Sequence, residues 1–207
     1  MEYIDIKKGY TEKHIERAKE ILENGGIVIL PTDTVYGLSA DCLNEEAIRK
    51  IYKLKHRNYS KACCVLVSNI KMIEEITEGI SKKEENIINR FFPGALTIIL
   101  EKNEKIPQIV TAGLDTIGIR MPDNNFLLDL ITELGRPIVT TSLNLAGEES
   151  IVNLEKLSSA FKDNVDLIID GGETKKKLAS TIIRVEKEEV KVLRQGPISK
   201  EDIEKVC

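Results

Sequence analysis

Hydroxyl, amide and cationic side chains recur at the ends of short apolar segments along this chain. They are Thr32, Thr34, Tyr36, Arg57, Lys61, Thr116, Arg120, Thr140, Ser142, Asn144, Ser180, Thr181 and Arg194. Ser, Thr and Asn also close strands and form turns for purely structural reasons. Strand ends in an open α/β sheet are nevertheless where ligands bind, and cations among the hydroxyls favour a ligand with several negative charges. The sequence therefore predicts a phosphate- or carboxylate-binding site.

Residues 25–61 hold hydroxyls and cations close together along the chain. The apolar residues 27–30 are typical of a buried strand, and the polar run 31–37 follows directly. A helical segment comes next and ends in the cationic run 55–61. One strand and one helix would bring the two kinds of group together, as a site for a small anionic substrate requires.

The common catalytic motifs are missing from the sequence. It contains no G-x-x-x-x-G-K-[ST], G-x-G-x-x-G, H-E-x-x-H or G-x-S-x-G motif. With only His14 and His56, a Ser-His-Asp triad has few candidates. The four cysteines form no C-x-x-C pair, which favours buried free thiols over disulfides or zinc ligands. Any metal is therefore expected to be Mg²⁺ that enters with phosphate groups.

Composition and charge exclude several classes of protein. The 207 residues carry a net charge of -4, which argues against coating nucleic acid by bulk charge but leaves a local basic patch open. Seven Lys or Arg and no Asp or Glu lie between Ala47 and Met72, although a solvated helix face also explains part of this run. No signal peptide or membrane-spanning stretch is present, so we expect a cytoplasmic protein.

Strand and helix patterns alternate along the chain. Helices are predicted after Thr11, Asn44, Ser68 and Ser81, over 124–134 and 154–161, and after Ser199; strands are predicted at 27–30, 62–67, 96–100, 117–120, 138–141 and 167–169, and a hairpin pairs 180–185 with 190–194. Because the later part has hairpin character, the predicted class is α/β with a twisted, mixed sheet and flanking helices. No repeat or linker interrupts the pattern, so residues 1–207 are expected to form one domain.

Seven short motifs occur in an order that identifies a family. They are residues 26–38, the K-x-R triplet 55–57, residues 93–97 and 120–122, the S-x-N triplet 142–144, and residues 180–182 and 194–196. In this order they resemble the motifs of the YrdC-like threonylcarbamoyladenylate synthases. Each motif is weak alone, but the match extends from about Thr11 to the end of the chain.

The resemblance implies a fold and a reaction. It implies a twisted, open sheet with a concave, cation-lined cavity. It also implies that L-threonine, bicarbonate or CO₂, and ATP with Mg²⁺ are converted into threonylcarbamoyl-AMP and pyrophosphate. Partner proteins of the family then transfer the threonylcarbamoyl group to the adenosine beside the anticodon of certain tRNAs. Whether tRNA itself touches this chain is left open.

The resemblance also assigns roles to individual residues. For L-threonine it implies Thr34, Tyr36, Arg120, Thr140 and Ser180; for ATP it implies Arg57, Lys61, Thr116, Ser142, Asn144, Ser150 and Arg194. The charge-neutralising set is Lys55, Arg57, Lys61 and Arg194. Because carbamate and triphosphate are both anions, the protein's main task would be alignment and neutralisation, without a protein nucleophile. The sequence nominates no general base.

Two positions depart from the family pattern. Family members usually continue Lys-Pro-Leu after the K-x-R triplet, whereas this chain has Lys61, Ala62 and Cys63 and so lacks the fixed φ angle of proline. Some members place a His where Leu66 stands, so we expect a threonine subsite that is built differently or is less selective. The chain stops at Cys207, soon after the last motif, and in this it resembles the single-domain branch of the family. Any lid is then expected to be a loop or a partner.

Two alternatives to the synthase follow from the same residues. An RNA-binding or ribosome-assembly protein would use the same basic concavity, but only 4% of the residues are aromatic and single-stranded RNA recognition relies on stacking. A carbamoyl transfer like that of hydrogenase-maturation proteins ranks last, because their acylphosphatase and zinc-finger parts have no counterpart in this sequence.

Overall fold

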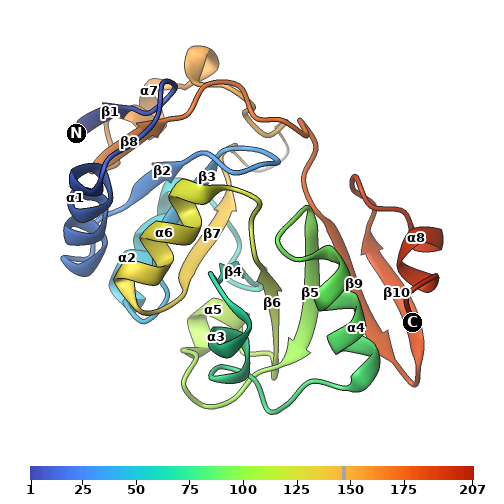
Figure 1. Ribbon diagram of the computed structural model, residues 1–207. Coiled ribbons are helices and arrows are strands. Elements are labelled where there is room, and N and C mark those ends of the chain that lie inside the picture. The colour runs from blue at the N-terminus through green and yellow to red at the C-terminus, as the bar shows by residue number, and fades with distance from the viewer. Residues whose placement is uncertain (146–147) are drawn as a thin grey trace.

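A ten-stranded sheet runs through the whole molecule (Figure 1). The computed structural model describes residues 1–145 and 148–207. The strands are β1 (Glu2–Asp5), β2 (Val28–Leu30), β3 (Gly37–Asp41), β4 (Cys64–Leu66), β5 (Leu96–Glu101), β6 (Thr116–Arg120), β7 (Ile138–Ser142), β8 (Leu167–Asp170), β9 (Thr181–Glu186) and β10 (Glu189–Arg194). Their order across the sheet is β1-β8-β2-β3-β7-β4-β6-β5-β9-β10.

The strand directions are mixed. The pairs β1–β8, β2–β8, β4–β6 and β5–β9 are parallel, and the pairs β2–β3, β3–β7, β4–β7, β5–β6 and β9–β10 are antiparallel. This confirms the predicted α/β class with a twisted, mixed, open sheet.

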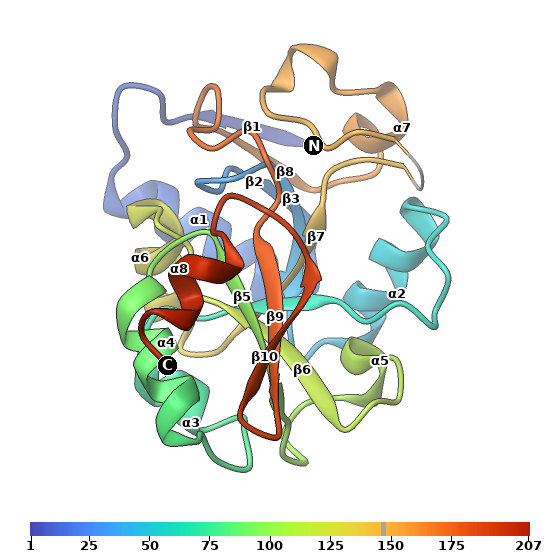
Figure 2. The same ribbon diagram turned by 90° about the vertical axis from the view of Figure 1, so that its right-hand side faces the viewer.

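Helices cover both faces of the sheet. They are α1 (Glu12–Glu23), α2 (Glu45–Leu54), α3 (Ile70–Glu74), α4 (Lys82–Phe91), α5 (Gln108–Thr111), α6 (Asn125–Leu134), α7 (Ser159–Lys162), α8 (Lys200–Glu204) and the 3₁₀ turn η1 (Leu154–Lys156). Figure 2 shows α1, α3, α4, α6 and α8 on one side of the sheet and α2 and α5 on the other. Among the described residues, no helix is both long and apolar enough to cross a membrane.

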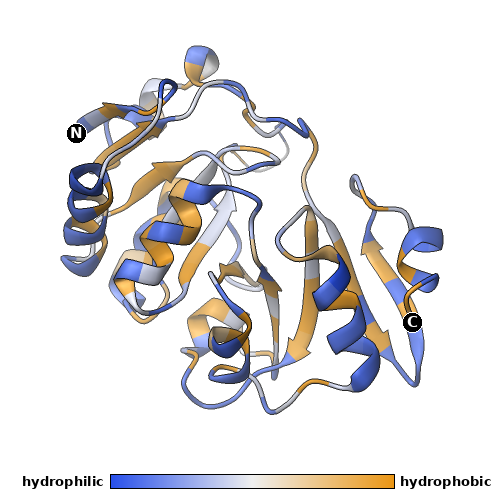
Figure 3. Ribbon diagram, viewed as in Figure 1, coloured by the Kyte–Doolittle hydropathy of each residue, from blue (hydrophilic) through white to orange (hydrophobic). Residues whose placement is uncertain are grey.

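Local sequence signals explain where the longer helices begin and end. Asn44 and Asn124 cap α2 and α6 by accepting hydrogen bonds from backbone N–H groups in the first turn. Ser81 and Glu84 form a capping box at the start of α4. Gly135 ends α6 with φ +70°, a left-handed conformation that glycine adopts without strain. Figure 3 shows the hydrophobic strands against hydrophilic outer faces of α1 and α4, so the core lies between the sheet and its helices.

Three sequence predictions differ from the structure. The segment 37–41, expected to lead into a helix, is the strand β3, so the chain after β2 first turns back across the sheet. The helix predicted over 154–161 is instead the turn η1 followed by the four-residue α7. The edge strand β1 was not predicted, because its alternating polar residues leave only Ile4 partly buried.

Close packing between β3 and β7 depends on the glycine that begins β3. Gly37 pairs with Ser142 in the ladder, and a Cβ at Gly37 would lie 2.4 Å from the Thr140 Oγ1. Thr140 Oγ1 also lies 3.0 Å from Ser39 Oγ, so this hydroxyl is fixed between two positions of β3. A methyl group at residue 37 would therefore have to displace a buried, hydrogen-bonded side chain.

We expect Gly37→Ala to lower the free energy of unfolding by about 1–3 kcal/mol, because overpacking at a buried contact costs this much. Urea unfolding followed by circular dichroism measures it. Gly37→Ala should cost less in a Thr140→Ala background, where the colliding hydroxyl is gone. If Gly37→Ala lowers the free energy of unfolding equally with Thr140 and with Ala at residue 140, then the contact with the Thr140 hydroxyl is not what excludes a side chain at residue 37.

Candidate active site

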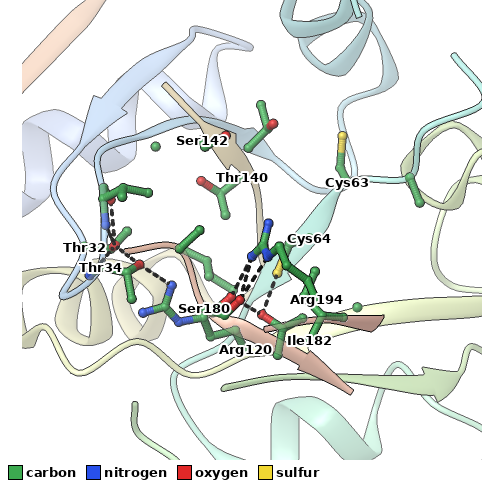
Figure 4. Close-up of a pocket in the computed structure, with 18 of the residues that line it drawn as sticks. Thr32, Thr34, Cys63, Cys64, Arg120, Thr140, Ser142, Ser180, Ile182 and Arg194 are labelled. Atoms are coloured by element: carbon green, nitrogen blue, oxygen red, sulfur yellow. Dashed lines mark hydrogen bonds between the residues drawn. The ribbon is translucent and has the colours of Figure 1, made fainter. Parts of the chain in front are cut away.

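A cavity of about 230 Å³ lies over the middle of the sheet (Figure 4). Alternate residues of the strands point into it, since side chains two apart share one face of a sheet. Its lining includes Thr32, Thr34, Val35, Tyr36, Gly37, Arg57, Ala62, Cys63, Cys64, Leu66, Thr97, Ile99, Gly118, Arg120, Thr140, Thr141, Ser142, Ala179, Ser180, Ile182 and Arg194. Three of these side chains are cationic and none is a carboxylate, so the cavity is suited to an anion.

The loop between β2 and β3 forms one wall and is fixed by its own hydroxyls. Thr32 Oγ1 accepts hydrogen bonds from the Thr34 and Val35 N–H groups at 3.0 and 3.2 Å and donates to the Val35 carbonyl at 2.7 Å. Because the single Thr32 proton is used there, the Thr34 hydroxyl is the donor in the 2.9 Å contact between the two threonines. The Thr34 oxygen then remains free to accept a hydrogen bond.

Arg120, at the end of β6, donates a hydrogen bond to this Thr34 oxygen. Its Nη1 donates to Thr34 Oγ1 at 2.7 Å (Figure 4). Its Nε donates to the Gly94 carbonyl at 2.9 Å, and its Nη2 forms an ion pair with Asp33. The residue is only 5% exposed. Burial lowers the pKa of Arg120, and the Asp33 carboxylate opposes that shift.

Arg194, at the end of β10, occupies the other wall. Its Nε and Nη2 donate to the Ser180 carbonyl at 3.0 and 2.8 Å, and Nη2 also contacts Ser180 Oγ at 3.1 Å. Ser180 Oγ lies 2.8 Å from Thr97 Oγ1, which fixes the serine rotamer. The predicted residues Arg120, Ser180 and Arg194 are thus brought together, as Figure 4 shows.

Arg57 follows α2 and reaches the cavity from the K-x-R triplet. Its Nε and Nη2 donate to the carbonyls of Lys61 and Ala62 at 3.2 and 2.6 Å. Tyr52 donates to the same Lys61 carbonyl at 2.8 Å, so the loop is pinned without the proline that the family usually has after the lysine. The exposed Lys61 side chain is not among the cavity-lining residues.

Lys55 joins the K-x-R and S-x-N triplets beneath the cavity. It is 3% exposed, and its ammonium group donates to the Ser142 carbonyl and, at 3.2 Å, to Asn144 Oδ1. The Ser142 hydroxyl donates to the same Asn144 oxygen at 2.6 Å. The Asn144 amide donates to the carbonyls of Leu145 and Glu148 at 3.0 and 2.9 Å. Burial, reinforced by Arg57, lowers the pKa of Lys55 to about 8.

Four predicted site residues are placed differently from the rest. Tyr36 lines the cavity, but its hydroxyl donates to the Gly172 carbonyl at 2.7 Å and is not available there. Thr116 starts β6, two residues before Gly118, and is not a lining residue. Ser150 and Asn144 instead line a neighbouring cavity of about 720 Å³.

Sequence reasoning missed several residues of the cavity. Cys64 and Ile182 lie in strands whose apolar patterns gave no hint of which face holds the cavity. Asp33, which does not line the cavity but pairs with Arg120, was also missed, although it stands between the predicted Thr32 and Thr34. Leu66, the position where some family members have His, contributes an apolar wall to the cavity.

The described residues offer no ready metal centre. No group of three or more His, Cys, Asp or Glu side chains within residues 1–145 and 148–207 is placed to hold a metal ion. All four cysteines are free; Cys42 and Cys63 are buried as expected, whereas Cys207 is exposed.

The fold and the arginine-lined cavity define an α/β protein built for a small anionic ligand, and comparison with known proteins identifies its family. The family model described as Sua5_yciO_yrdC, Telomere recombination, matches residues 20–196. The chain belongs to the Sua5/YciO/YrdC family.

Two similar proteins with curated names are threonylcarbamoyl-AMP synthases. The Pyrococcus abyssi enzyme is 34% identical over 98% of this chain, which spans only 60% of the length of that enzyme. The putative enzyme of Methanocaldococcus jannaschii is 39% identical over 94% of this chain and 91% of its own length. The crystal structure of P. abyssi Sua5 complexed with L-threonine superposes with a TM-score of 0.95 at 34% identity, covering all of this chain and 61% of that one.

Because its pKa is lowered, Lys55 should make the free energy of unfolding rise with pH between about pH 8 and 10.5. The folded-state pKa of Lys55 is about 8, below the ordinary lysine value of 10.5. Its contribution to the free energy of unfolding is therefore fully present above about pH 10.5 and is lost as the pH falls through 8. Full titration corresponds to up to about 3 kcal/mol, at roughly 1.4 kcal/mol per pKa unit.

Urea unfolding of wild type and Lys55→Met between pH 7 and 10 measures the effect. The free energy of unfolding of the wild type should rise with pH relative to that of the variant. Lys53→Met, at an exposed position of the same helix, controls for loss of a charge from α2. Parallel pH profiles for wild type and Lys55→Met would contradict the lowered pKa.

Proposed function

We propose that this chain synthesises threonylcarbamoyl-AMP from L-threonine, bicarbonate or CO₂, and ATP, with release of pyrophosphate. The observation that carries the proposal is the close superposition on the P. abyssi protein complexed with L-threonine. The proposal extends that protein's named activity to a chain that spans 60% of its length. The cavity's chemistry agrees, because its lining combines hydroxyls with three arginines.

The positions of the cations support a division of the cavity into two parts. Arg120, paired with Asp33, would receive the α-carboxylate of threonine beside Thr34. Thr140 and Ser180 would complete the amino-acid subsite. Arg57 and Arg194 carry no carboxylate partner among the described residues and would face the triphosphate. Lys55, which fixes Ser142 and Asn144, would add positive charge behind that part.

The reaction has two steps, and the protein supplies charge and alignment to both. The threonine amine loses a proton and forms an N–C bond to CO₂, which gives a carbamate. A carbamate oxygen then forms a bond to the α-phosphorus while the bond to pyrophosphate breaks in line. Mg²⁺ bound by ATP would share the phosphate charge. Because nucleophile and electrophile are both anionic, fixed arginines are the main contribution of the chain.

The proposed reaction also requires a downstream partner protein and a cellular location. Threonylcarbamoyl-AMP is a mixed anhydride that water can destroy, so a transferase must receive it and pass the group to tRNA. We propose that this work takes place in the cytoplasm, where ATP and tRNA are both present.

Pyrophosphate release tests the proposed reaction. Purified protein with L-threonine, bicarbonate, Mg²⁺ and ATP should release pyrophosphate only when threonine is present, and mass spectrometry should detect the mixed anhydride. Threonine-independent release, or none, would refute the proposal. If tRNA then binds with an affinity that falls steeply with salt, the RNA-binding alternative takes its place.

Substitutions should separate the two parts of the cavity. Arg57→Ala should raise the KM for ATP about tenfold or more, and Arg120→Ala should do the same for threonine, because each removes charge-assisted hydrogen bonds. Arg184→Ala, on β9 but paired outside the cavity with Glu101, is the control and should change neither constant. The reverse pattern would show that the two substrates are assigned to the wrong ends.

A further inference from the structure

The guanidinium group of Arg120 is held from three directions. Of its five N–H donors, one is used by Gly94, one by Thr34 and one by Asp33. Two donors are therefore left for a ligand in the cavity. Because two contacts come from the loop between β2 and β3 and the third from the segment before β5, they fix the plane of the guanidinium as well as its position.

Asp33 is itself rigidly placed. It is 3% exposed, and its Oδ1 accepts a second hydrogen bond from the Asp123 N–H at 3.2 Å. Its carbonyl accepts from the Lys176 N–H at 2.9 Å, which ties the loop to the segment after β8. The hydroxyl of Thr32 fixes the backbone on the other side of Asp33.

The Asp33 carboxylate does not reach the main cavity. Asp33 lines a separate hollow with Pro31, Asp123 and Thr174, and it is not among the residues that line the cavity of Arg120. A ligand bound beside Thr34 and Arg120 would therefore touch the arginine without touching Asp33. Any effect of Asp33 on such a ligand must pass through the guanidinium.

The pairing also sets the charge that a ligand meets. An arginine whose charge is matched by a buried carboxylate offers two directed N–H donors with little net charge. This suits the carboxylate of a zwitterionic amino acid, whereas the unmatched Arg57 and Arg194 suit a triphosphate. The difference between the two ends of the cavity thus depends on one carboxylate.

We propose that Asp33 is a positioning residue that orients Arg120 for the α-carboxylate of the amino-acid substrate. This inference rests on the proposed function, since it concerns the amino-acid subsite of that reaction. It assigns Asp33 no contact with the substrate and no role in proton transfer.

Steady-state pyrophosphate release by Asp33→Asn, Arg120→Ala and the double variant tests the inference. Asp33→Asn should raise the KM for threonine about tenfold, the equivalent of one lost charge-assisted hydrogen bond. Its KM for ATP should stay within about twofold of wild type, because Asp33 does not contact Arg57 or Arg194, the residues assigned to the triphosphate. In the Arg120→Ala background, Asp33→Asn should change the KM for threonine by less than about twofold, because the residue it acts through is gone.

Asp41→Asn is the matched control. Asp41 is a buried aspartate whose Oδ2 accepts from Arg136 Nε at 2.7 Å, and it lies outside the cavity lining. It should lower stability without changing either KM. If Asp33→Asn alone does not fold, Asp33→Glu takes its place: it keeps the charge but displaces the carboxylate by one methylene group, so the KM for threonine should still rise while the KM for ATP does not.

The outcomes separate two failures. If the wild type releases no threonine-dependent pyrophosphate, the proposed function is wrong. If the wild type is active but Asp33→Asn keeps its KM for threonine, raises both KM values equally, or has the same effect with and without Arg120, the positioning role is wrong.

Discussion

A guanidinium group cannot be buried without acceptors for its protons and a charge to match its own, and Arg120 imposes this requirement on much of the molecule. The end of β6 brings the arginine, the loop between β2 and β3 brings Asp33 and Thr34, and the segment before β5 brings the Gly94 carbonyl. Three distant parts of the chain must be in place together before the pair is satisfied. The cavity therefore forms only when the fold is complete.

The cavity lies on a face of the sheet and uses the alternation of its strands. Residues two apart, such as Gly118 and Arg120 on β6 or Thr97 and Ile99 on β5, line it while the side chains between them enter the core. The strand ends add Ser142 from β7 and Arg194 from β10. A regular sheet thus supplies a dense set of fixed groups, and the loops after β2 and α2 complete the walls together with Ala179 and Ser180 before β9.

The sequence was sufficient for the α/β class, most helices and the set of arginines around the cavity, because caps, periodicity and motif order are local signals. It was insufficient for β3, since Gly37–Asp41 is buried on both faces and lacks the alternation typical of strands. It also could not separate Lys61, whose side chain is exposed, from Arg57 four residues earlier, because loop geometry decides which cation turns inward. Asp33 escaped notice because a carboxylate among threonines is typical of turns; its role depends on Arg120, 87 positions away in the chain.

The edge strand β1 has a consequence for the order of events during synthesis. Among the described residues, Glu2–Asp5 pairs only with β8, Leu167–Asp170, so β1 has no partner in the sheet until about 165 further residues have been made. At roughly 5–20 residues per second, this wait lasts on the order of 8 to 30 seconds. Its carboxylates Glu2 and Asp5, one at each end of the strand, suit such a wait, since charged side chains on an unpaired strand oppose pairing with other strands in the meantime.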